Sequence, residues 1–73
     1  MWLPPRRLEV LEGMAFGWSI EEIAAAMGVS PNTVKAQSKV LFAVLGVRCR
    51  AHAVAIGYQH GLLGLSTPAE RAA

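Results

Sequence analysis

The second half of the chain is cationic, because no aspartate or glutamate lies between residues 28 and 69. Its four basic residues are Lys35, Lys39, Arg48 and Arg50. Residues 1–27 hold two arginines against four glutamates. Ammonium and guanidinium groups bind phosphate oxygens, and lysine also donates to the acceptor edge of guanine. A chain polarised in this way is suited to meeting a polyanion with one side. Solvation of separate surface charges is the alternative.

Other chemistry has little support in the sequence. No serine has a neighbouring histidine and acid, and there is no glycine-rich phosphate loop, so we expect no enzyme. Cys49, His52 and His60 share one stripe of a predicted helix. At 1.5 Å per residue, however, the first and last of them lie about 16 Å apart along its axis. We therefore expect no metal and no cofactor.

Length and composition indicate one small domain. The chain has 73 residues, of which 53% are apolar and 16% charged, a balance too hydrophobic for disorder. We expect a domain over residues 1–64 and a flexible tail over residues 65–73. No apolar run approaches the about 20 residues that cross a bilayer, and the single cysteine fits a reducing compartment. We expect a cytoplasmic protein, at the nucleoid and not at a membrane.

Helical periodicity dominates, and nothing alternates as a strand does. A first helix is predicted from Pro5, with Leu8, Leu11 and Ala15 facing inward. A second begins after Ser19, because Ser19 and Glu22 form a capping-box pattern. Its predicted buried stripe is Ile23, Ala24 and Met27. Trp2 and Trp18 are predicted to cover the core.

A short turn follows the second helix. Gly28 suits a left-handed helix end, and Ser30 with Pro31 is typical of the next helix start. A link of about three residues forces a compact crossing, which predicts a helix-turn-helix.

The third helix is predicted over residues 31–45, with two different faces. The core face holds Val34, Ser38, Leu41, Phe42 and Leu45. The opposite arc holds Asn32, Thr33, Ala36, Lys39, Val40, Ala43 and Val44, with Lys35 on its edge. A fourth helix is predicted to stop near Gly61.

The fourth helix has apolar residues on more than one side. One arc holds Ala51, Val54, Ala55, Tyr58 and Leu62. In so small a domain such a helix is shared with a neighbour, so we predict a homodimer interface there. A two-fold dimer would present its third helices to half-sites about one DNA turn apart.

The chain resembles the LuxR/GerE-type helix-turn-helix DNA-binding domain. The resemblance covers about residues 3–63 and rests on three blocks, "LPPRRLEVL", "IEEIAAAMGVSPNTVK" and "LGVRCRAHAVAIGYQHGLL". It implies an all-α fold of four helices, a regulator of transcription, and double-stranded DNA as the partner. We expect a stand-alone domain, because no residues here are suited to receive phosphate or a small ligand. In this family the third helix enters the major groove and the fourth commonly forms the dimer contact.

The resemblance and the residue chemistry give one set of DNA-binding residues. Carried over by position, Lys35, Ala36 and Lys39 fall on the recognition face, and Thr33 falls on a backbone-contacting position. A recognition helix reads bases from its N-terminal half, where asparagine favours adenine and small apolar groups touch the thymine methyl. The complete predicted set is Asn32, Thr33, Lys35, Ala36, Lys39, Val40, Arg48 and Arg50.

The chain departs from the family pattern at several positions. Arg7 stands where relatives usually carry an acid that forms a charge pair, and Pro4 replaces a capping threonine. Ser38 replaces a common valine on the core face, so its hydroxyl needs a hydrogen bond if buried. Ala43 and Val44 replace a basic pair.

The missing basic pair leaves an apolar strip of Val40, Ala43 and Val44 beside the predicted DNA face. Isolated apolar surface residues are normal, but contiguous ones favour a protein partner. The alternative function is therefore a protein-interaction module that binds a transcription factor, a sigma factor or RNA polymerase through this strip and the fourth helix.

Overall fold

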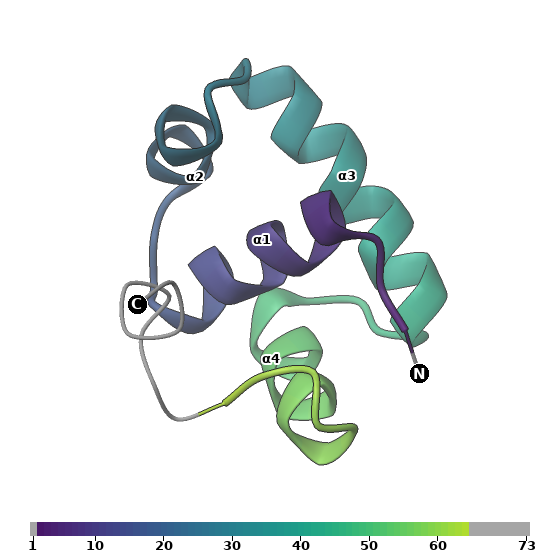
Figure 1. Cartoon of the computed structure of the whole chain (residues 1–73). Helices are drawn as coiled ribbons and strands as arrows, with labels where there is room; N and C mark the ends of the chain where they lie inside the picture. The colour runs from purple at the N-terminus through teal and green to yellow at the C-terminus, as the bar shows by residue number, and fades with distance from the viewer. Residues whose placement is uncertain (1, 65–73) are drawn as a thin grey trace.

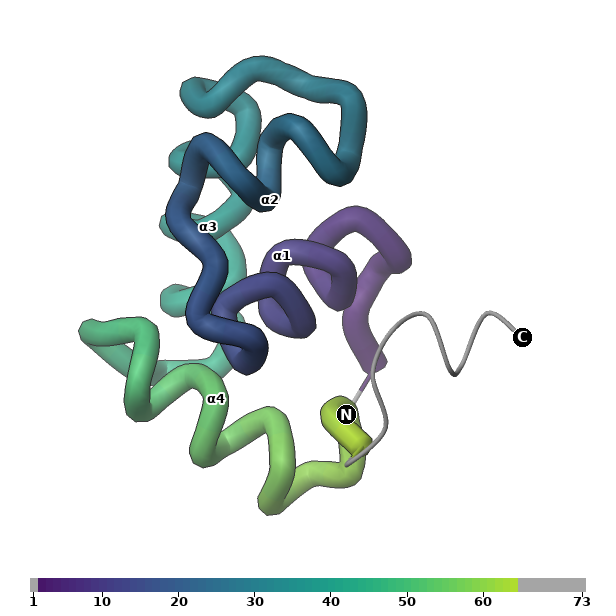
Figure 2. Tube along the Cα trace, turned by 90° about the vertical axis from the view of Figure 1, so that its left-hand side faces the viewer, coloured from purple at the N-terminus to yellow at the C-terminus, as the bar shows by residue number. Residues whose placement is uncertain are grey.

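Four helices make up the fold in the computed structural model, which describes residues 2–64. They are α1 (Pro5–Ala15), α2 (Ile20–Met27), α3 (Pro31–Leu45) and α4 (Arg50–Gln59). Both backbone views place α1 in the middle, with α2 and α3 on one side of it and α4 on the other (Figures 1 and 2). The predicted all-α fold of four helices is confirmed. The predicted tail over residues 65–73 lies outside the described residues.

The starts of the first two helices differ, because only α2 has a side-chain cap. Pro4 precedes α1 and provides no side-chain cap, as its replacement of threonine predicts. At α2 the predicted capping box is present: Ser19 Oγ accepts from the Glu22 backbone N–H at 3.1 Å, and Glu22 Oε1 accepts from the Ser19 N–H at 2.8 Å. Hydrogen bonds to the Glu22 carboxylate, from the Ser19 backbone N–H first and from the Ser19 hydroxyl second, hold the pKa of Glu22 below its ordinary value.

Two glycines end helices in the left-handed conformation, as the sequence predicts for Gly28. Gly28 has φ 70° after α2, and Gly46 has φ 70° after α3. Only residues 28–30 join α2 to α3, so the two helices cross sharply and form the predicted helix-turn-helix. This turn orients α3 relative to the rest of the domain.

The core lies around α1, which packs against the other three helices. Leu11 is fully buried as predicted, but Leu8 and Ala15 are only partly buried. Val10 and Met14, outside the predicted stripe, are buried instead. The prediction assumed one inward face, whereas α1 has neighbours on two sides and therefore buries a wider arc.

The residues predicted for the cores of α2 and α3 are confirmed, with two of them only partly covered. Ile23 and Ala24 of α2 and Val34, Ser38, Leu41 and Leu45 of α3 are buried, whereas Met27 and Phe42 are partly buried. The buried hydroxyl of Ser38 donates to the Val34 carbonyl at 2.8 Å, which supplies the hydrogen bond that burial requires.

A glycine allows α4 to approach α1 closely. A Cβ atom at Gly57 would lie 2.8 Å from Leu63 Cδ1 and 3.0 Å from Leu11 Cδ2. Both distances are shorter than ordinary van der Waals contact. Ala53 and Gly57 are the buried residues of α4, so small side chains form its inner face.

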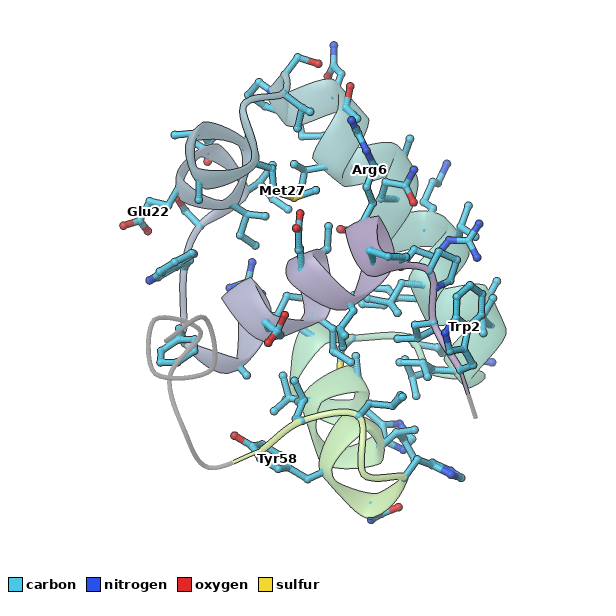
Figure 3. The ribbon with its side chains drawn as sticks, viewed as in Figure 1. Trp2, Arg6, Glu22, Met27 and Tyr58 are labelled. Carbon is cyan, nitrogen blue, oxygen red and sulfur yellow. The ribbon has the colours of Figure 1, made fainter. Side chains whose placement is uncertain are left out.

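Trp2 and Arg7 both lie in surroundings that need comment. Trp18 packs against the core as predicted, but the prediction for Trp2 was wrong, because its side chain is 76% exposed (Figure 3). Arg7, which replaces an acid, is half-buried, and its buried Nε has no hydrogen-bond partner among the described residues. The expected loss of a charge pair thus coincides with an unsatisfied donor.

No single helix within residues 2–64 is long and apolar enough to cross a membrane. The bent pair α3 and α4 passes this test by length and composition only.

Candidate nucleic-acid interface

The start of α3 is held by a side-chain cap. Ser30 Oγ accepts from the Thr33 backbone N–H at 3.2 Å, and the two hydroxyl oxygens lie 3.0 Å apart. Pro31 occupies the first turn, where its missing N–H costs nothing. Thr33 is partly buried, so its hydroxyl serves the cap first, whereas Asn32 is exposed on the same turn. The positive end of the helix dipole and an exposed amide therefore point to solvent together.

The outward face of α3 carries the residues predicted to meet DNA. Lys35, Ala36, Lys39 and Val40 are all exposed. Buried residues lie between them in the sequence, because the inward and outward faces of an α-helix are about half a turn apart. No acid lies between residues 28 and 64, so no carboxylate of α3 or α4 reduces the positive potential of this face. The face can bind phosphate oxygens and the acceptor edges of bases.

The two arginines after α3 differ in their surroundings. Arg48 is exposed in the turn between α3 and α4. Arg50 is partly buried, and its Nη1 donates to the backbone carbonyl of Trp18. This bond joins the start of α4 to the α1–α2 loop. Sequence reasoning missed it because the two residues lie 32 positions apart. A guanidinium has five N–H donors, so Arg50 retains donors for a second partner.

The predicted dimer residues of α4 fall into two groups. Ala51, Ala55 and Tyr58 are exposed, and Tyr58 projects outward from the helix (Figure 3). Val54 and Leu62 are partly buried and pack against the core, so only part of their surface is open to a neighbour. The homodimer interface stays a prediction.

The family is decided by a match over most of the chain. Residues 1–56 match the GerE family model, described as bacterial regulatory proteins, luxR family. The chain belongs to the LuxR family. The resemblance drawn from the three sequence blocks is therefore confirmed.

Known LuxR-family relatives are similar over most of the chain. It is 48% identical over 54 residues to the probable transcriptional regulatory protein SgaR of Hyphomicrobium methylovorum, covering 74% of this chain and 26% of SgaR. Identity to the probable transcriptional regulatory protein NarL of Mycobacterium tuberculosis is 46% over 61 residues, covering 84% of this chain and 28% of NarL. The chain spans less than a third of either relative.

A solved structure has the same fold. The crystal structure of the response regulator ChrA, from a heme-sensing two-component system, matches with a TM-score of 0.81 at 30% identity. The match covers 86% of this chain and 31% of ChrA.

The second half of α3 in this LuxR-family domain exposes apolar side chains. Val40 is 41% exposed and Val44 46% exposed, and Ala43 between them is exposed as well. These three residues form the apolar strip that the sequence predicts, and they continue the outward face that begins at Lys35. The strip provides no charge for a phosphate, so the cationic part of α3 is confined to its first two turns and the start of the third.

Proposed function

We propose that this LuxR-family chain binds double-stranded DNA in a sequence-specific manner and regulates transcription as a homodimer, with the first half of α3 in the major groove. The observation that carries the proposal is the exposure of Lys35 and Lys39 on the outward face of a capped helix. If these side chains had been covered by other parts of the domain, the proposal would have no surface to rest on.

The surroundings of the two lysines fit a base-reading role. Ala36 lies between them and is small, which lets the helix backbone approach the base edges closely. Asn32 is exposed in the first turn, where its amide can pair with adenine. Arg48 follows α3 at the surface, in a position to bind phosphate, and Arg50 can add a phosphate contact through its remaining donors. The domain would act in the cytoplasm, where the duplex is.

The homodimer would form through the exposed side of α4. Ala51, Ala55 and Tyr58 give this side small residues around one aromatic ring, a combination that packs closely across a two-fold axis. Two copies of α3 would then meet half-sites about one DNA turn apart. Selection of duplexes from a random pool by the full chain should therefore yield a palindrome.

The experiment combines that selection with gel shifts at several salt concentrations. Ala55→Glu places a charge in the proposed seam, so affinity for the palindrome should fall to that for a single half-site. His60→Glu puts the same charge at the exposed end of α4, outside the seam, and should bind as the wild type does. Recovery of no preferred sequence at low salt would contradict sequence-specific binding, and an unchanged Ala55→Glu affinity would contradict this dimer.

The exposed apolar strip favours a second function. Val40 and Val44 form a row one turn apart on α3, close to half exposed, and could pack against a helix of a transcription factor, a sigma factor or RNA polymerase. Capture of RNA polymerase holoenzyme in the absence of DNA would test this. Val44→Glu should abolish capture and leave DNA binding intact. Equal capture by the wild type and Val44→Glu would rule out the strip as the contact.

A further inference from the structure

A cavity of about 260 Å³ lies between α1 and α2, away from the cationic face of α3. Glu9 and Glu12 of α1 form one wall, and Ile23 and Met27 of α2 form the other. Trp18, in the loop that joins the two helices, also lines it. Met27 reaches from α2 towards α1 in the side-chain view (Figure 3). None of the residues proposed to meet DNA lines this groove.

The groove follows from the way the two helices cross. A Cβ atom at Gly13 would lie 2.6 Å from Ile23 Cγ1 and 3.4 Å from Trp18 Cε3, so α1 and α2 are in close contact at this glycine. Figure 1 shows α2 nearly end-on while α1 runs across the view, which is a steep crossing. Helices that cross steeply separate quickly on either side of their contact. The groove occupies the space that this separation leaves.

The Trp18 wall is held from two sides. Its backbone carbonyl accepts from Arg50 Nη1 at the start of α4. Its indole ring lies 5.9 Å from the ring of Phe16, tilted by 34°, within the range of a favourable aromatic pair. The aromatic side of the groove is therefore formed before any ligand arrives, as in most small-molecule sites.

The lining residues select for charge and for shape. Glu9 and Glu12 lie three positions apart on the same face of α1, and no lysine or arginine lines the groove. The Glu9 carboxylate repels anions and attracts cations. The face of an indole attracts ammonium groups, and a methionine thioether contacts aromatic rings favourably. The complementary molecule has an ammonium group next to a small apolar body.

We propose that the α1–α2 groove is a binding site for a small organic cation, with an arylalkylamine as the fitting class. A cavity of about 150 Å³ holds a benzene ring, so the larger groove admits a ring and a two-carbon amine. The ring would lie against Met27 and Ile23, and the ammonium group would lie between Glu9 and the indole of Trp18. This site is independent of whether α3 binds DNA.

The test uses the full chain with Trp2→Phe, which leaves Trp18 as the only tryptophan. Trp2 is 76% exposed, so this change leaves the core intact. Phenethylamine is titrated while the fluorescence of Trp18 and the backbone amide NMR shifts are followed. A dissociation constant on the order of 0.1–1 mM is expected for so few atoms, with shifts confined to α1, the loop and α2. The neutral analogue 2-phenylethanol should bind at least threefold more weakly, and phenylacetate should not bind.

Two matched variants locate the charge that matters. Glu9→Gln should weaken phenethylamine binding about threefold, the size of a partly screened ion pair. Glu21→Gln removes the same charge from an exposed position of α2 outside the groove, and it should leave binding unchanged. Equal affinity for the amine and the alcohol, equal weakening in both variants, or amide shifts centred on α3 or α4 would each overturn the proposal.

Discussion

Removing Lys35 and Lys39 together gives the sharpest test of whether α3 meets DNA. Both side chains are exposed, so the double variant Lys35→Ala, Lys39→Ala should fold like the wild type. Each subunit has four cations on or next to the proposed face, and a dimer has twice that number. The logarithm of the affinity falls with the logarithm of the salt concentration by about 0.9 for each phosphate neutralised. The slope is therefore at most about −7 for the wild type and about −3.6 for the variant.

These slopes predict a difference that is easy to measure. Between 50 and 200 mM salt the wild type should lose a factor of about 10⁴ in affinity, and the double variant a factor of about 150. Fluorescence anisotropy with a labelled selected duplex at five or more salt concentrations gives both slopes. Arg6→Ala is the matched control, because it removes a cation from the exposed first turn of α1 (Figure 3).

Two results would refute the reasoning. The first is a double variant with the wild-type slope, which would mean that neither lysine displaces counterions from the duplex. The second is an equal decrease in slope per lost charge for Arg6→Ala and for the double variant. The change in slope would then reflect net charge and not the position of the two lysines. Circular dichroism of each variant confirms that the helices are retained.

Three further predictions concern stability and base reading. Ser19→Ala and Ser30→Ala should each lower the free energy of unfolding by about 1 kcal/mol at pH 7. Because the folded-state pKa of Glu22 is lowered, the stability that the Glu22 carboxylate contributes is lost as the pH falls through that pKa. Urea titrations should therefore show that the cost of Ser19→Ala decreases in acid, whereas the cost of Ser30→Ala stays constant. Gly57→Ala should lower stability by about 1 kcal/mol, since overpacking of about 1–3 kcal/mol outweighs a helix-propensity gain of about 1 kcal/mol, and a higher urea midpoint would contradict this. Replacing thymines of the selected duplex one at a time by deoxyuridine should weaken binding about fourfold where Val40 meets the methyl group. The Val40→Ser variant should bind the thymine and deoxyuridine duplexes equally well. If Val40→Ser still preferred the thymine duplex, contact between Val40 and the methyl group would be excluded.

Helix boundaries could be predicted from sequence because their signals are local. The Ser19 capping box, the Ser30 cap and the left-handed Gly28 all involve residues within a few positions of one another, and all three are present. The outward face of α3 followed from the same local period, since all its inward residues except Ser38 are large and apolar.

Features that depend on contacts between helices could not be predicted in this way. Val10 and Met14 are buried because α1 has neighbours on two sides, which a single helical wheel does not represent. The inner face of α4 consists of Ala53 and Gly57, whose small side chains carry almost no hydrophobic signal. The bond from Arg50 to Trp18 joins positions 32 residues apart, so no local pattern indicates it.

The close seating of α4 on α1 has a geometric consequence for a paired regulator. A methyl group at Gly57 would press on the side chains of Leu63 and Leu11, and any part of this strain that they do not absorb would push α4, with the proposed seam, away from α1. In a two-fold assembly each subunit would be displaced by the same amount, so the change in separation between the two α3 helices would be doubled. In the proposed dimer, a span matched to one helical turn of the duplex, about 34 Å, is then sensitive to a single carbon atom that lies far from any base.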